Sequence, residues 1–90
     1  MSEGFRWNES NIEHATKHGC SIAEIEMVVR REVRSRRDRK VGNGKWFVEG
    51  RGIGDRIIRV VFVYDDPEKT TICVIHAMPL TTRRKRGGRR

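Results

Sequence analysis

The chain has 90 residues, which is enough for a single domain with a small hydrophobic core. Hydrophobic residues make up 36% of it and charged residues another 36%, and the formal net charge is +8 at pH 7. The longest apolar run, at residues 60–64, has five residues. A run this short excludes a helix that spans a bilayer, so we expect no membrane partner.

The first residues, Met1-Ser2-Glu3-Gly4, lack the basic start and the apolar stretch of a signal peptide, so we expect a cytoplasmic protein. Cys20 and Cys73 are too few for a disulfide scaffold, and they show no spacing typical of a zinc site. We therefore expect two reduced thiols and no metal or cofactor. One domain should extend over residues 1–90, with a core at about residues 5–80 and a basic tail at residues 81–90.

Beyond residue 4, the sequence predicts two helices before any long strand. A short extended segment at residues 5–7 leads to a helix over residues 8–17, with Asn8 as its N-cap. Residues 21–24 read Ser-Ile-Ala-Glu, a capping box that starts a second helix. Apolar residues recur at helical spacing from there as far as residue 29, and the period changes after that point.

The second half of the chain predicts four strands. Their expected ranges are residues 32–37, a weak edge strand, and residues 45–49, 56–64 and 70–77. Gly42-Asn43-Gly44 predicts a hairpin turn, because Asn-Gly accepts the positive φ angles of a type I′ turn. A short helix is expected at residues 80–86. The order predicts an α+β fold in which two N-terminal helices pack on a four-stranded antiparallel sheet, followed by a short basic C-terminal helix or tail.

Positive charge is concentrated in two short segments. Residues 30–40 carry seven basic and two acidic side chains, residues 83–90 carry six basic and none acidic, and the other residues have a net charge of −3. Concentrated positive charge attracts polyanions and releases counterions on phosphate. Arginine outnumbers lysine 15 to 5, which suits bidentate phosphate contacts. The pattern favours a nucleic-acid partner; the alternative is a solvated face and tail with no partner.

The strands also carry side chains that suit RNA cleavage without a metal. Two strands that a turn should pair carry Arg56, Arg59, His76 and, as a further candidate, Tyr64. Lys45 and Arg51 lie on the neighbouring strand. In such cleavage the 2′-hydroxyl attacks phosphorus, cations stabilise the phosphorane, and a histidine near neutral pKa protonates the leaving oxygen. The alternatives are a packed or edge histidine at position 76 and a single solvent-facing arginine at position 59.

Several short motifs resemble the opening of the BrnT family of bacterial toxins. The residues concerned are Phe5-Arg6-Trp7-Asn8, Asn11, Lys17-His18-Gly19-Cys20-Ser21 and Glu24. The family typically begins with an F-x-W-D-like element, an asparagine, and a K-H-G-[IV]-S step between two helices. Gly50-Arg51, Arg56 and the basic end after Thr81 look similar as well, so the resemblance extends loosely over residues 5–86.

The resemblance implies membership of the RelE-like ribonuclease toxins, with two helices against an antiparallel sheet. It also implies a small cytoplasmic toxin encoded beside an antitoxin that wraps and neutralises it. Carried over by position, Lys45, Arg51, Arg56 and Arg83 fall on typically basic sites. The segment 78–80, Met-Pro-Leu, stands where BrnT-like chains usually carry arginines.

We therefore expect a metal-independent endoribonuclease toxin that inhibits translation, acts on RNA such as ribosome-bound mRNA, and is neutralised by a cognate antitoxin protein. The candidate catalytic residues are His76, Arg56, Arg59, Lys45 and Arg83. The candidate RNA-binding residues are Arg51, Arg84, Lys85, Arg86, Arg89 and Arg90. The alternative is a non-catalytic RNA- or DNA-binding module in which the basic segments alone contact the nucleic acid.

Overall fold

The structure, a computed structural model, describes residues 4–80 and has an α+β fold, as the sequence predicted. In chain order its elements are β1 (Gly4–Phe5), α1 (Glu9–Thr16), α2 (Ile22–Arg34), β2 (Arg39–Gly42), β3 (Lys45–Arg51), β4 (Ile57–Tyr64) and β5 (Thr71–Pro79). A short 3₁₀ turn, Ile53–Asp55, connects β3 to β4. The predicted tail at residues 81–90 lies outside the described residues, as does the predicted helix beyond Leu80.

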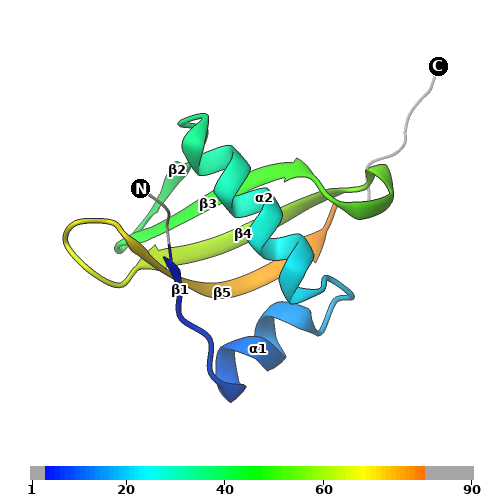
Figure 1. Cartoon of the computed structure of the whole chain (residues 1–90), viewed down its shortest axis with the longest axis horizontal. Coiled ribbons are helices and arrows are strands. Elements are labelled where there is room, and N and C mark those ends of the chain that lie inside the picture. The colour runs from blue at the N-terminus through cyan, green and yellow to red at the C-terminus, as the bar shows by residue number, and fades with distance from the viewer. Residues whose placement is uncertain (1–3, 81–90) are drawn as a thin grey trace.

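The sheet differs from the prediction in its number of strands and in one direction. It has five strands in the order β1-β5-β4-β3-β2, and the neighbours from β2 to β5 are antiparallel (Figure 1). The added strand, β1, runs parallel to β5, with Gly4 opposite Thr71 and Phe5 opposite Ile72. The prediction of a four-stranded antiparallel sheet was therefore wrong. A two-residue strand has no periodicity, so the sequence showed only an extended segment there.

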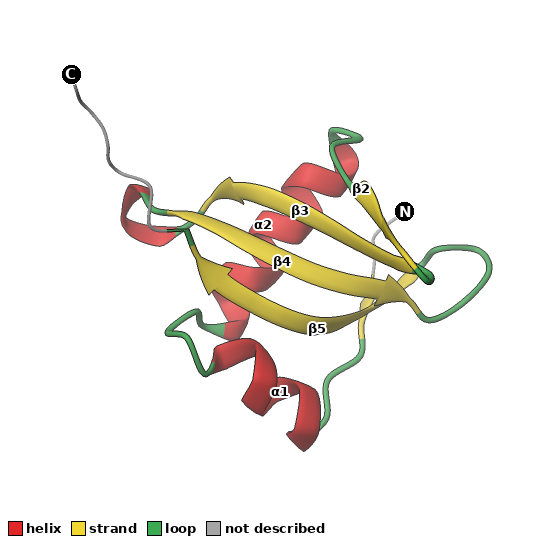
Figure 2. Ribbon diagram, turned by 180° about the vertical axis from the view of Figure 1, so that it is seen from behind, coloured by secondary structure: helices red, strands yellow, loops and turns green. Residues whose placement is uncertain are grey.

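The two helices occupy different positions on the sheet. Helix α2 crosses one face, and α1 lies beside β5, near the edge of the sheet (Figure 1). The buried core between these layers includes Ile25 and Val28 of α2 and Val60 and Phe62 of β4. The view from behind shows the strands in front of α2, with no helix over this second face in the described part of the chain (Figure 2). This uncovered surface is the open face of the sheet.

Residues 32–37 do not form the predicted edge strand. Helix α2 continues to Arg34, and β2 begins only at Arg39. Glu32 is buried on the helix, where its carboxylate contacts Arg31 at 3.0 Å and Arg37 at 3.7 Å. These two arginines offset the cost of burying the charge of Glu32. Helix α2 can therefore extend past the predicted start of the strand.

The local turn and cap signals were largely correct. Asn43 and Gly44 have φ angles of 54° and 76°, which confirms the predicted hairpin turn between β2 and β3. Ser21 caps α2 by accepting a hydrogen bond from the Glu24 N–H at 3.1 Å. The reciprocal half of that predicted capping box is absent, because the Glu24 carboxylate is bonded to other groups. The full capping box is at α1, between Asn8 and Asn11.

No helix within residues 4–80 combines the length and the apolar character that crossing a membrane requires.

Phe62 is the largest of the fully buried side chains, so it tests the placement of the core. Phe62→Ala should lower the free energy of unfolding by about 3–5 kcal/mol, because it removes buried apolar surface and leaves a cavity. Val41, 55% exposed on β2, is the control, and Val41→Ala should change stability by less than about 0.5 kcal/mol. Urea unfolding followed by circular dichroism measures both. Equal losses in the two variants would contradict this core.

Candidate nucleic-acid interface

The open face is built from alternate residues of four strands. In β3 and β4 the core residues Val48, Val60 and Phe62 point toward the helices, so the residues between them point the other way. Directly opposed residues of paired strands share a face, which extends the set to β2 and β5. The open-face residues are Arg39; Lys45, Phe47, Glu49 and Arg51; Ile57, Arg59, Val61 and Val63; and His76 and Met78, whereas Cys73 of β5 contacts Asn11 of α1.

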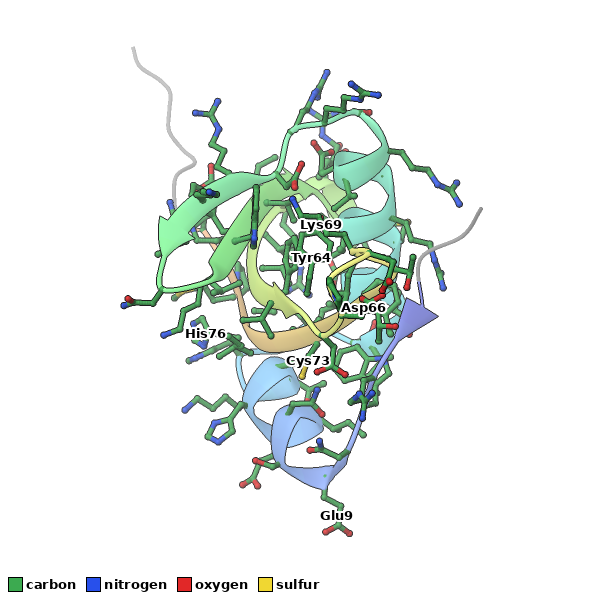
Figure 3. The ribbon with its side chains drawn as sticks, turned by 90° about the vertical axis from the view of Figure 1, so that its left-hand side faces the viewer. Glu9, Tyr64, Asp66, Lys69, Cys73 and His76 are labelled. Carbon is green, nitrogen blue, oxygen red and sulfur yellow. The ribbon has the colours of Figure 1, made fainter. Side chains whose placement is uncertain are left out.

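His76 reaches this face because β5 contains a bulge. Val74 is buried and pairs with Phe62, so simple alternation would turn residue 76 toward the helices as well. The register instead skips Ile75, which brings His76 opposite Val61 and turns Ala77 into the core. In Figure 3, His76 accordingly lies on the side of the sheet away from α2.

One row of side chains crosses the open face at right angles to the strands. Arg39 is opposite Phe47, Phe47 is opposite Val61, and Val61 is opposite His76. Arg59 belongs to the next row, and its guanidinium lies 5.0 Å from the centre of the Phe47 ring. The structure therefore brings two of the predicted catalytic residues, Arg59 and His76, to diagonal positions on neighbouring strands.

His76 lies in a setting that favours its neutral form. Its Nε2 is 3.4 Å from the Met78 sulfur, and its ring meets the His18 ring edge to face with centroids 5.2 Å apart. Burial lowers the pKa of His76, and the nearby His18, Lys17 and His14 lower it further. Since the ordinary pKa of histidine is about 6.5, the imidazole is mainly neutral at pH 7 and can accept a proton.

Arg59 has a different kind of neighbourhood. Its guanidinium donates hydrogen bonds to the Glu49 carboxylate, and both side chains are more than a third exposed. Exposed ion pairs contribute little to stability, so a phosphate can compete for this arginine at small cost. Arg59 is thus held over the open face without being locked there.

Arg56 lies on the other side of the sheet from His76. It donates to the Glu24 carboxylate at 2.7 Å and to the Gly19 carbonyl at 2.8 Å, which joins the start of α2 to the start of β4. The Ile53 N–H donates to the same carboxylate at 2.8 Å. The guanidinium of Arg56 is the main reason that the pKa of Glu24 is lowered. This geometry suits a structural role, and the catalytic role of Arg56 stays a prediction.

The remaining predicted residues are dispersed. Lys45 and Arg51 lie at the two ends of β3 on the open face, and Arg51 is 3.8 Å from Asp55 in an exposed pair. The predicted catalytic Arg83 lies outside the described residues. The same holds for the predicted RNA-binding residues Arg84, Lys85, Arg86, Arg89 and Arg90.

Two members of the row that leads to His76, Phe47 and Arg39, were not among the residues predicted from the sequence. Phe47 is two residues from Lys45 on a predicted strand, so alternation already put both on one face. Arg39 was hidden in the basic run at residues 30–40, whose course after Arg34 was wrongly predicted. If the end of α2 had been predicted at Arg34, Arg39 could have been assigned to the strand that follows it.

Within residues 4–80 no group of three or more His, Cys, Asp or Glu side chains is arranged to hold a metal ion. Comparison with known proteins found no family model, curated protein or solved structure that matches the chain significantly.

The Glu24–Arg56 pair predicts acid sensitivity. Glu24→Gln should lower the free energy of unfolding at pH 7 by about 1.5–3 kcal/mol, because Arg56 and the Ile53 N–H lose a charged hydrogen-bond acceptor. The pKa of Glu24 lies below its ordinary value in the folded protein, so its stabilisation is complete above about pH 4.3. That stabilisation is lost as the pH falls through the folded pKa, because the unfolded chain takes up the proton first.

The difference in unfolding free energy between the wild type and Glu24→Gln should therefore narrow in acid. Urea titrations at a series of pH values measure it, with Glu13→Gln on the exposed side of α1 as the control. A difference that is constant from pH 7 to pH 3 would show that Glu24 is not charged in the folded protein.

Proposed function

We propose that this chain is a cytoplasmic, metal-independent endoribonuclease toxin with a RelE-like fold, similar to the BrnT family, and that a cognate antitoxin neutralises it. The observation that carries the proposal is a half-buried imidazole, His76, diagonal to the cation Arg59 on an uncovered sheet face. The basic run at residues 30–40 and the family-like opening support it as well. Inhibition of translation follows if the RNA cut is mRNA.

The proposed reaction uses these two side chains in turn. His76 takes the proton of the 2′-hydroxyl, whose oxygen then forms a bond to the adjacent phosphorus. Arg59 leaves Glu49 and stabilises the extra negative charge on the phosphorane. The bond from phosphorus to the 5′ oxygen breaks, and His76 returns its proton to that oxygen. The products are a 2′,3′-cyclic phosphate and a 5′-hydroxyl end, and no metal takes part.

The lowered pKa of His76 refines the role given to it. Sequence reasoning assigned it the protonation of the leaving oxygen, for which an imidazolium is needed. In the reaction above it begins as the base, which the neutral form at pH 7 permits, and becomes the acid only after taking the proton. One imidazole then serves both steps.

A non-catalytic RNA- or DNA-binding module is the second candidate. Two candidate catalytic arginines already have acidic partners, because Arg56 bonds to Glu24 and Arg59 bonds to Glu49. Arginines that are paired in this way are less available to stabilise a phosphorane, which favours binding without cleavage. Met78 also contacts His76, and the segment 78–80 lacks the arginines usual in BrnT-like chains. Such a module would bind RNA and leave it intact, which separates the two candidates by experiment.

Induced expression of the wild-type chain without an antitoxin should arrest growth, and mapping of RNA ends should show new cuts with 5′-hydroxyl termini. The physical reason is the proposed cleavage of mRNA. His76→Ala, expressed to the same soluble level, is the control and should relieve the arrest. Normal growth with abundant soluble wild-type protein and intact RNA would reject the ribonuclease and leave the binding module.

The pH dependence of cleavage tests His76 itself. His76→Ala should lower the single-turnover cleavage rate by about 10²-fold or more, the usual scale for loss of a general base. In the wild type the rate should rise with pH, with its midpoint below about pH 6.5, and then level off, because the pKa of His76 is lowered in the folded protein. Glu13→Gln, on the exposed side of α1, provides the control, because Glu13 is not among the groups that shift the pKa of His76. A rate that falls between pH 5 and pH 7 would require His76 to start as an acid instead.

A further inference from the structure

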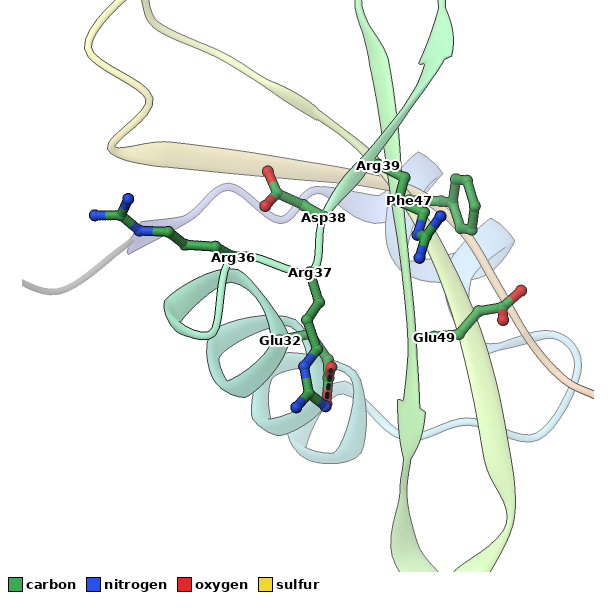
Figure 4. A pocket seen from close by; sticks show the side chains of 7 residues that line it. All are labelled: Glu32, Arg36, Arg37, Asp38, Arg39, Phe47 and Glu49. Carbon is green, nitrogen blue, oxygen red and sulfur yellow. Dashed lines mark ion pairs between the residues drawn. The ribbon is translucent and has the colours of Figure 1, made fainter.

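A cavity of about 390 Å³ lies between the C-terminal end of α2 and the edge of β3. Its lining residues are Glu32, Arg36, Arg37, Asp38, Arg39, Phe47 and Glu49 (Figure 4). Its volume is within the range of small-ligand sites. Two of these residues, Arg39 and Phe47, belong to the row that leads across the open face to His76. The cavity therefore continues the candidate interface at its far end.

The acidic groups of the cavity are all engaged. Glu32 is paired with Arg31 and Arg37, and Glu49 is paired with Arg59. Asp38 accepts a hydrogen bond from the Tyr64 hydroxyl at 3.1 Å.

Arg39 is the cation that the cavity leaves available. Its exposed side chain makes no ion pair with the other described residues. Arg36 is exposed too, but in Figure 4 it points away from Phe47, whereas Arg39 lies beside that ring. The free positive charge of this pocket therefore adjoins its aromatic ring.

An aromatic ring beside an arginine suits a nucleotide. Phe47 is half-buried on the open face, with Arg39 opposite it and the Arg59 guanidinium 5.0 Å from its centre. Bases stack on aromatic rings in single-stranded nucleic acid complexes, and arginines beside them contact the phosphates. The carboxylates of Asp38 and Glu49 can accept hydrogen bonds from base amino groups.

We propose that this pocket is a nucleotide subsite for single-stranded RNA, in which a base stacks on Phe47 and its phosphate contacts Arg39. The RNA strand then runs across β2, β3 and β4 toward His76. Three strand spacings of about 4.8 Å separate Arg39 from His76, so a few nucleotides span the row. This inference rests on the proposed function, since it takes RNA as the substrate.

The affinity of the full chain for a short 2′-O-methylated oligoadenosine tests the subsite apart from cleavage, because this RNA has no free 2′-hydroxyl but keeps the base amino groups. Fluorescence anisotropy gives the dissociation constant. Phe47→Leu should weaken binding roughly tenfold through loss of stacking, while Phe47→Tyr, which keeps the ring, should bind like the wild type.

The salt dependence of the same binding tests Arg39. Arg39→Gln should reduce the slope of log affinity against log salt by about 0.7, the value for one phosphate contact with a single strand. Arg30→Gln is the matched control: it removes a charge from the same basic run, but on α2, where Arg30 pairs with Glu26. It should leave the slope unchanged.

Equal affinities for Phe47→Leu and Phe47→Tyr, or equal slopes for Arg39→Gln and Arg30→Gln, would overturn the subsite. The two proposals fail separately. If the wild type binds along the row but does not cut RNA, the ribonuclease is rejected and the subsite stands. If it cuts RNA and the paired variants do not differ, the subsite is rejected and the ribonuclease stands.

Discussion

The buried carboxylate of Glu24 is the constraint on which the layout of this small fold depends. Its side chain is 1% exposed, and such a charge is tolerated only because Arg56 and the Ile53 N–H bond to it. Arg56 in turn holds the Gly19 carbonyl, so the start of α2, the loop before it and the start of β4 meet at one point. A Cβ at Gly52 would clash with the Glu24 Oε2, so any other residue there would displace the carboxylate that Arg56 and the Ile53 N–H hold.

This anchoring on one side of the sheet leaves the other side for binding. Arg56, the arginine nearest the start of β4, is used for structure, whereas Arg59, three residues later, points to the open face and holds only an exposed partner. The bulge at Ile75 brings His76 to that same face. Position relative to α2, more than residue type, therefore separates the structural arginine from the one proposed to act on RNA.

Local signals in the sequence predicted much of the fold and less of the site. The caps at Asn8 and Ser21 and the turn at Asn43 depend on neighbouring residues, and the structure confirms them. What was missed depends on residues far apart in the chain. Glu32 is buried against Gly50 of β3, where a Cβ would lie 2.8 Å from its Oε2, and β1 exists only because β5 accepts it. No sequence pattern predicts a one-residue bulge. Alternation along β5 could therefore not show on which face of the sheet His76 lies.

The place of β5 in the sheet has a consequence for synthesis. It lies between β1 and β4, yet it is the last of the described strands to leave a ribosome. Until Thr71–Pro79 has been made, β1 has no neighbour and the core lacks Ile72, Val74 and Ala77. Pairing across so long a stretch of chain also slows folding, because chain entropy is lost before the contact forms. While most of the chain is being translated, the nascent polypeptide therefore has an incomplete sheet and lacks His76. The domain can assemble only after β5 has emerged from the ribosome.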